Sequence, residues 1–255
     1  TFLDPCCGSG NFIIEAIKKG ISPENVYGFD VDENAVAITK KRIKELSGHD
    51  SKNIICADFL SQQPAANSQQ FDYIFTNPPW GKKIKKADKV RYSYLYNSGN
   101  VLDTSAIFYF ACLNVLKKDG MIGMLLPDSF FNIGSFENAR ISLLSLKINR
   151  FVDYGKAFKE LMTKAMAFIA TNANSQQPTA NSQIQCEIYN VKKHLRSQES
   201  FVDIPKHIFN FHIEESESDI IRRVFSLPHI TLKDNAKWGL GIITGKFLHD
   251  NTLDL

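Results

Sequence analysis

Short apolar runs alternate with longer stretches whose apolar residues recur at helical spacing through the first two thirds of the chain. The short runs predict buried strands, and the periodic stretches predict amphipathic helices. The predicted strands are one at the very start of the chain, which includes residue 1, and those at residues 26–32, 53–56, 71–76, 120–126, 150–154, 165–170 and 186–191, and the predicted helices span residues 12–19, 36–46, 106–116 and 136–146. This alternation predicts an α/β fold with a doubly wound, mainly parallel sheet, helices on both faces, and ligands at the carboxyl ends of the strands.

A glycine turn follows the first predicted strand, in the segment Asp4-Pro5-Cys6-Cys7-Gly8-Ser9-Gly10. Gly8 and Gly10 allow positive φ angles and a close approach of the backbone to a ligand. The dinucleotide-binding fingerprint would place a third glycine at position 13, where this chain has Ile13. The turn therefore favours a ligand that lacks a pyrophosphate.

Acidic residues lie in or just after the next two predicted strands. Asp30 lies 20 residues after Gly10, the usual position of the acid that binds ribose hydroxyls. Asp58 is placed to accept a hydrogen bond from an adenine amine, and Phe59 is placed to pack on a purine ring. S-adenosylmethionine meets these requirements together. Taken singly, Asp32 and Asp58 are equally consistent with a helix cap or a surface carboxylate.

The tetrapeptide Asn77-Pro78-Pro79-Trp80 follows the strand predicted at 71–76. Methylating a planar amine requires acceptors that draw its nitrogen toward tetrahedral geometry, and the Asn77 side chain and the Pro78 carbonyl supply two of them. Trp80 offers a flat face on which a base swung out of a duplex can stack. The alternative is a plain turn after a buried strand. The cofactor motif upstream favours the catalytic interpretation.

Together these two motifs resemble those of the amino-methyltransferases of bacterial restriction-modification systems, in particular the N6-adenine DNA methyltransferases. The resemblance covers residues 1–170 and departs from the family at Cys6, where alanine is usual. It implies a Rossmann-like, S-adenosylmethionine-dependent methyltransferase fold and a reaction that needs no metal. The implied site residues are Asp4, Gly8 and Gly10 at the methionine part of the cofactor, Asp30 at its ribose, Asp58 and Phe59 at its adenine, and Asn77, Pro78, Pro79 and Trp80 in catalysis.

The resemblance also implies an aromatic residue on the far side of the flipped base. The candidate is Phe158, in the segment Gly155-Lys156-Ala157-Phe158, although an aromatic beside an apolar strand is as commonly a core residue. The implied partners are double-stranded DNA with a flipped adenine and a restriction or specificity subunit or a fused nuclease. The implied function is site-specific methylation of the adenine N6 amine in a restriction-modification system.

Two other functions stay open. Enzymes that methylate amines in RNA or a glutamine in a protein share a similar tetrapeptide, because any planar amine poses the same chemical problem. A chain of a different class would hold DNA as a non-catalytic fragment of a larger complex. Binding of S-adenosylmethionine separates the second alternative from the enzymatic functions.

Three regions are expected along the chain. Because residue 1 falls inside the first predicted strand, we expect a catalytic domain at 1–192 that lacks its N-terminal part. A drop in motif density predicts a linker region at 193–227, with an exposed helix at 216–227. The segment 238–246 resembles the entry to a target-recognition domain in the family, so we expect that domain to start within 228–255.

Composition is that of a globular domain, with 44% hydrophobic and 22% charged residues among 255. The sequence shows no apolar stretch of membrane-spanning length and no zinc-binding spacing. Five scattered cysteines suggest free thiols in a reducing compartment, and no membrane partner is expected; the resemblance implies that this compartment is the bacterial cytoplasm. Two matching polar segments, 61–70 and 175–184, are expected to be loop insertions.

Net charge is only +3, but basic residues gather after the tetrapeptide. They are Lys82, Lys83, Lys85, Lys86, Lys89 and Arg91, and Tyr92, Tyr94 and Tyr96 follow them. We expect a loop here that neutralises phosphates and stacks bases of a displaced nucleic-acid strand. A solvated loop without a ligand is the alternative.

Overall fold

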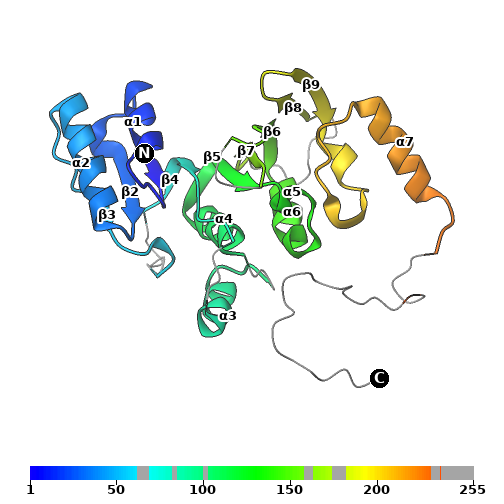
Figure 1. Ribbon diagram of the computed structural model, residues 1–255, viewed down its shortest axis with the longest axis horizontal. Coiled ribbons are helices and arrows are strands. Elements are labelled where there is room, and N and C mark those ends of the chain that lie inside the picture. The colour runs from blue at the N-terminus through cyan, green and yellow to red at the C-terminus, as the bar shows by residue number, and fades with distance from the viewer. Residues whose placement is uncertain are drawn as a thin grey trace, which may run out of the picture.

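The strands of the computed structural model form one mixed sheet in the order β3-β2-β1-β4-β5-β7-β6-β8-β9 (Figure 1). The structure describes residues 1–61, 69–81, 85–99, 103–157, 163–173, 182–230 and 236. The strands are β1 (Phe2–Asp4), β2 (Val26–Asp30), β3 (Ile54–Cys56), β4 (Phe71–Thr76), β5 (Leu116–Pro127), β6 (Lys147–Asp153), β7 (Ala165–Thr171), β8 (Gln183–Ile188) and β9 (Lys192–Ser197). The helices are α1 (Asn11–Lys18), α2 (Glu33–Ser47), α3 (Lys86–Leu95), α4 (Thr104–Val115), α5 (Ser129–Asn132), α6 (Glu137–Leu144) and α7 (Glu215–Ser226).

Strands β1 to β5 are parallel throughout, which confirms the predicted parallel sheet. Strand β7 runs antiparallel to both of its neighbours, β5 and β6, and β6 runs parallel to β8. Consequently β4, β5, β6 and β8 all end at the same edge of the sheet as β1, β2 and β3. The residues that follow these strands therefore share one edge, as expected for ligand sites in open α/β sheets.

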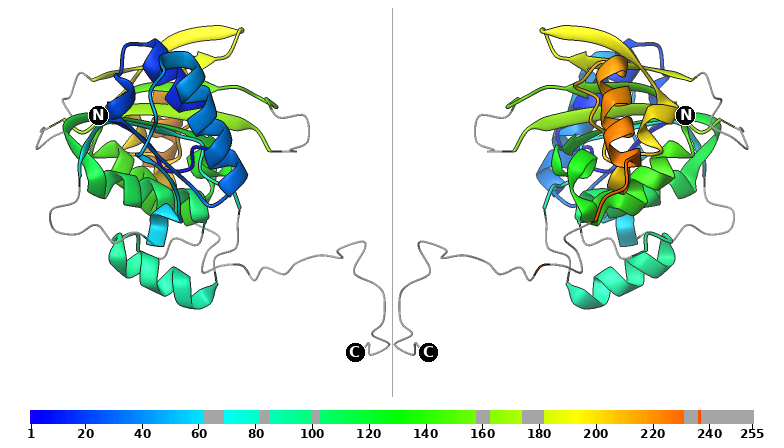
Figure 2. Two further views of the ribbon diagram at one scale, coloured as in Figure 1. Left: turned by 90° about the vertical axis from the view of Figure 1, so that its left-hand side faces the viewer. Right: turned by 90° about the vertical axis from the view of Figure 1, so that its right-hand side faces the viewer.

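Apolar residues pack on both faces of the sheet. Alternate residues of a strand point to opposite faces, so neighbouring residues of one strand belong to different cores. On β1, Phe2 packs into a core with Ile13 of α1 and Val36 of α2. The next residue, Leu3, belongs to a larger core on the opposite face that includes Phe108 of α4 and residues of α6. Figure 2 shows α2 in front of the sheet from one end of the molecule and α7 in front from the other.

Residues 192–226 pack onto this sheet, which differs from the linker predicted at 193–227. Strand β9 pairs with β8 along its whole length, and α7 contacts β9. Phe201, Phe209 and Phe211 are at most 2% exposed and join the larger core. The prediction missed this packing because β9 is an edge strand rich in charged residues and shows no apolar run.

The basic segment after the tetrapeptide contains a helix, α3, where a loop was predicted. Tyr92 and Tyr96 are buried, and the Tyr96 hydroxyl donates to the Leu60 carbonyl at 2.7 Å, so the expectation that these two rings face nucleic acid was wrong. Tyr94 is 92% exposed, so its contact with nucleic acid stays a prediction. Lys82 and Lys83 lie outside the described residues. None of the helices in the described ranges combines the length and apolar character that crossing a bilayer requires.

Candidate active site

Two adjoining cavities open at the carboxyl edge of the sheet, with volumes of about 490 and 570 Å³. Both fall in the size range of small-molecule sites, about 300–1,000 Å³. The first is lined by Pro5, Cys6, Asp30, Val31, Ala57, Asp58, Phe59, Leu60, Asn77, Pro79, Lys85, Asp88, Tyr92, Thr104 and Phe108. The second is lined by Asn77, Pro78, Pro79, Trp80, Gly81, Asp103, Pro127, Asp128, Ser129 and Thr163. Asn77 and Pro79 line both cavities and therefore lie between them.

The glycine turn supports residues that line the first cavity, since it follows Pro5 and Cys6 and contacts Asp30. Gly8 and Gly10 have φ angles of 50° and 83°, the left-handed region that glycine tolerates best. The Gly8 N–H donates to the Asp30 carboxylate at 2.8 Å. A Cβ on Gly10 would lie 2.7 Å from Thr39 Cγ2, so this glycine is required by packing against α2. Neither glycine, nor Asp4, is among the lining residues, and their contact with a ligand remains a prediction.

Two of the predicted acids, Asp30 and Asp58, do line the first cavity. Asp30 accepts from the backbone N–H of Gly8 and of Asp32, which leaves further lone pairs for a ligand. Asp58 accepts from the Leu60 N–H at 3.0 Å and from the Tyr92 hydroxyl at 3.4 Å. Asp32, in contrast, caps α2, so the helix-cap alternative holds for that residue.

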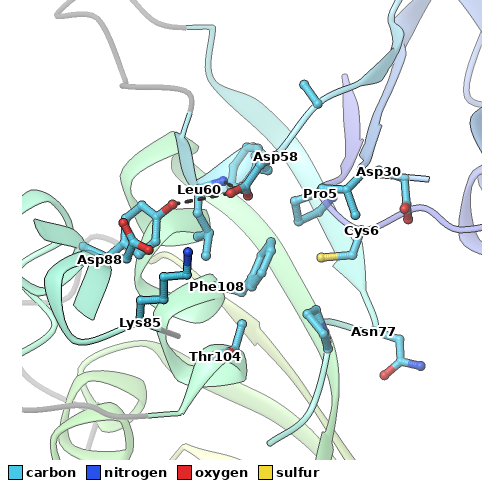
Figure 3. A pocket seen from close by; sticks show the side chains of 15 residues that line it. Pro5, Cys6, Asp30, Asp58, Leu60, Asn77, Lys85, Asp88, Thr104 and Phe108 are labelled. Atoms are coloured by element: carbon cyan, nitrogen blue, oxygen red, sulfur yellow. Dashed lines mark hydrogen bonds between the residues drawn. The ribbon is translucent and has the colours of Figure 1, made fainter. Parts of the chain in front are cut away.

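An aromatic wall closes the same cavity. Phe59 stacks on Phe108 with ring centroids 6.3 Å apart and contacts Phe29 at 5.4 Å. Phe59 was predicted from the sequence, whereas Phe108 was not, because a phenylalanine on the apolar helix α4 resembles an ordinary core residue. Lys85, which was expected at nucleic acid, and Asp88, which was not singled out, line the side opposite Pro5, Cys6 and Asn77 (Figure 3).

The tetrapeptide forms the boundary with the second cavity. Pro78 is buried, whereas Asn77 and Pro79 are exposed at the edge. The Trp80 indole N–H donates to the Leu125 carbonyl at 3.2 Å, which fixes the ring against β5. Thr76 pairs with Met124, so the tetrapeptide leaves β4 beside residues 125–127, the last residues of β5. Phe158 lies outside the described residues, but Thr163 beyond that gap lines the second cavity. No group of His, Cys, Asp or Glu within the described ranges is arranged to hold a metal ion.

Asp4 is a buried carboxyl directly beneath this edge, 1% exposed. One oxygen accepts from the Cys6 N–H at 3.2 Å. Burial raises the pKa of Asp4 from 3.8 to about 7, and the negative charge of Asp30 adds to the rise. The folded protein therefore holds a proton on Asp4 under mildly acidic conditions, where the unfolded chain has lost it.

This shift predicts that stability falls as the pH rises. Between about pH 4 and pH 7 the folded state binds more protons at Asp4 than the unfolded state, so the free energy of unfolding decreases through that window. Asp4→Asn removes the titrating group, so the decrease in the free energy of unfolding between pH 5 and pH 7 should be smaller by about 2 kcal/mol than in the wild type. Urea unfolding at both pH values checks this, with the exposed Asp50→Asn as control. Equal slopes in the wild type and Asp4→Asn would contradict the prediction.

The chain is similar to known methyltransferases. The model of a family described as N-6 DNA Methylase matches residues 1–146. The chain is 46% identical over 245 residues to the type II methyltransferase M.VspI from Vibrio sp. (strain 343), covering 96% of this chain and 59% of that protein. It is 30% identical over 122 residues to a probable tRNA (guanine(10)-N2)-dimethyltransferase from Methanothermococcus thermolithotrophicus, covering 46% of this chain and 72% of that one.

The fold also matches a solved structure. It superposes on the methyltransferase subunit of a type I restriction-modification system from Streptococcus thermophilus with a TM-score of 0.62 and 17% identity, over 81% of this chain and 52% of that chain. The match confirms the Rossmann-like methyltransferase fold expected from the sequence. Since the chain spans 59% of the length of the Vibrio protein, it corresponds to part of that relative.

Proposed function

Because the chain belongs to the N-6 DNA methylase family, we propose that it transfers a methyl group from S-adenosylmethionine to the N6 amine of adenine in DNA. The observation that carries this proposal is the position of Asn77. Its side chain borders a cavity with nucleoside-binding features on one side and a second cavity beside Trp80 on the other. A methyl donor and an acceptor base require two such adjacent sites.

The residues of the first cavity fit S-adenosylmethionine. Asp30 is placed to accept from the ribose hydroxyls and Asp58 from the adenine amine, and Phe59 and Phe108 offer apolar faces to the purine. Asp4, Gly8 and Gly10 shape the end nearest Cys6, where the methionine part would lie. When bound, this cofactor supplies an electrophilic methyl group.

The tetrapeptide holds and orients the target base. The Asn77 side-chain oxygen and the Pro78 carbonyl accept hydrogen bonds from the adenine amine and localise its lone pair on nitrogen. Trp80 stacks on one face of the flipped base, and Phe158 on the other. Pro79 restricts the backbone so that the Pro78 carbonyl keeps its direction. Positioning and electrostatics account for the rate, without a metal or a covalent intermediate.

The partner is double-stranded DNA with a flipped adenine, and the chain works in a restriction-modification system with a specificity or restriction subunit or a fused nuclease, in the bacterial cytoplasm. Residues 1–192 supply the catalytic domain, together with the strand and helix that follow on the same sheet. The target-recognition domain begins within 228–255, most of which lies outside the described residues.

Labelled-methyl transfer tests the function directly. The chain is incubated with methyl-labelled S-adenosylmethionine and bacterial DNA, and the DNA is digested to nucleosides. We expect the label in N6-methyldeoxyadenosine, and label in methylated cytosine or none in DNA would contradict the proposal. Pro78→Ala, which retains a backbone carbonyl but loosens its direction, should reduce the transfer rather than abolish it.

Methylation of RNA is the second candidate, favoured by the similarity to the tRNA methyltransferase. Parallel incubations with tRNA and with total cell protein separate the substrates, since only the true acceptor becomes labelled. Calorimetry with S-adenosylmethionine addresses the non-catalytic alternative. A chain that only holds DNA would show no heat of cofactor binding.

A further inference from the structure

Methyl transfer moves a positive charge across the active site, from the cofactor sulfur to the nitrogen of the acceptor. The attacked amine gains a methyl group and a positive charge, and it becomes neutral only when a proton leaves. A fixed negative charge beside that amine stabilises the transition state more than the ground state. The acceptors of the tetrapeptide, Asn77 and Pro78, are neutral and do not supply such a charge.

The second cavity contains a carboxylate at a suitable position. Asp128 follows the last residue of β5, which is the direct neighbour of β4. Thr76, the last residue of β4, pairs with Met124, and β5 continues for three more residues to Pro127 before Asp128 follows at the same edge of the sheet. Asp128, Asn77 and Trp80 all line the second cavity.

The backbone around Asp128 is held firmly. Its N–H donates to the Lys164 carbonyl at 3.1 Å, and its carbonyl accepts from the Phe131 N–H at 3.0 Å. Phe130 and Phe131, at most 1% exposed, anchor the turn that follows. The carboxylate is therefore presented from a rigid element, as precise electrostatic placement requires.

The Asp128 carboxylate is also uncommitted. Within the residues that the structure describes, no hydrogen bond or ion pair engages its oxygens. The other acid of the cavity, Asp103, differs in this respect. Its carboxylate accepts from the Ser105 N–H at 2.8 Å and from the Ser105 hydroxyl at 2.6 Å, and so caps α4. Asp128 is thus the acid that remains available to a substrate.

We propose that Asp128 is a further catalytic residue whose carboxylate lies beside the target amine, an inference that rests on the proposed function. The amine lone pair forms the new nitrogen–carbon bond as the carbon–sulfur bond breaks, with its electron pair going to sulfur. The carboxylate stabilises the positive charge that arrives on nitrogen and accepts the departing proton, which then passes to water. Atoms and charge balance without a further reactant.

Asp128→Asn tests this role because it keeps the size and one acceptor oxygen but removes the charge and the proton acceptor. We expect kcat for adenine methylation of DNA to fall about 100-fold, with the Kd for S-adenosylmethionine and the Tm unchanged. Asp128→Glu should recover part of the loss. The control is Asp119→Asn, the same change on β5 at an exposed residue with φ of 61°, where asparagine is well tolerated.

The outcomes are distinguishable. A wild-type kcat in Asp128→Asn overturns the catalytic assignment and leaves the methyltransferase function intact. A loss of kcat matched by an equal loss of cofactor affinity or of Tm also overturns it, because that pattern marks a structural role. Absence of methyl transfer by the wild-type chain, in the same assay, overturns the proposed function and this assignment with it.

Discussion

The Asn77→Ala variant should lose about 1000-fold in kcat for adenine methylation, while its Kd for S-adenosylmethionine stays within a few fold of the wild type. The alanine removes the side-chain oxygen proposed to accept from the target amine, so the nitrogen lone pair should stay delocalised in the ring. Cofactor binding should survive because the proposed cofactor contacts, Asp30, Asp58 and Phe59, line the first cavity and are unchanged in this variant. Steady-state kinetics and calorimetry measure the two quantities separately.

The matched control for this variant is Asn34→Ala. Asn34 is an exposed residue in the first turn of α2 that lines neither cavity, so kcat should not change. Asn77→Asp retains an acceptor oxygen in the same place and should keep more activity than alanine. An equal loss of kcat and of cofactor affinity in Asn77→Ala would refute the assigned role, because Asn77 would then support the cofactor site as a whole.

The second large effect is expected on stability, from Arg140→Met. Arg140 lies on α6 with no exposed surface, and its guanidinium donates to the backbone carbonyls of Phe130, Ile133, Lys206 and His207 at 2.7–3.2 Å. Desolvation lowers the pKa of this guanidinium to about 10, so it stays charged at neutral pH. Methionine of similar length would remove the guanidinium from four carbonyls, of which that of Ile133 would keep the Phe136 N–H at 3.1 Å, at a cost of about 4 kcal/mol.

Arg140 also joins two segments that are remote in the sequence. Lys206 and His207 both have positive φ angles, a backbone conformation that non-glycine residues rarely adopt without support. Phe130 and Ile133 belong to the turn that follows Asp128. Loss of the guanidinium should therefore loosen one wall of the second cavity as well as the packing of residues 205–211.

Scanning calorimetry checks this expectation, with a predicted decrease in Tm of about 10 °C. Arg222→Met is the control, because Arg222 forms ion pairs with Asp203 and Asp219 at the surface. This variant should change stability by less than about 0.5 kcal/mol. A Tm of Arg140→Met within about 2 °C of the wild type would show that water replaces the guanidinium at those carbonyls.

Much of the sheet and one side of each cavity were predictable from local sequence. The strand-turn pattern around Gly8 and the acid at the end of β2 predicted an edge with a nucleoside site, and the structure brings Asp30, Asp58, Phe59 and Asn77 to that edge. These features are encoded locally, because a positive φ angle or the end of a parallel strand depends on a few adjacent residues.

The opposite walls were not predictable in the same way. Phe108 and Tyr92 look like ordinary core or surface residues until α4 and α3 pack against the first cavity. The helix α3 was predicted as a loop because its lysines and tyrosines carry no clear apolar period. Asp128 had no motif at all, since its significance comes from the pairing of β5 with β4.

The sequence by itself determined the family, the parallel sheet and the edge that carries the chemistry, because each of these is written in short segments whose backbone geometry depends on neighbouring residues. Only the tertiary structure decided which side chains face those segments across the cavities, that β9 and α7 complete the fold, and that Arg140 is buried against four carbonyls. Such contacts join residues far apart in the chain, so their energies depend on packing that no local pattern records.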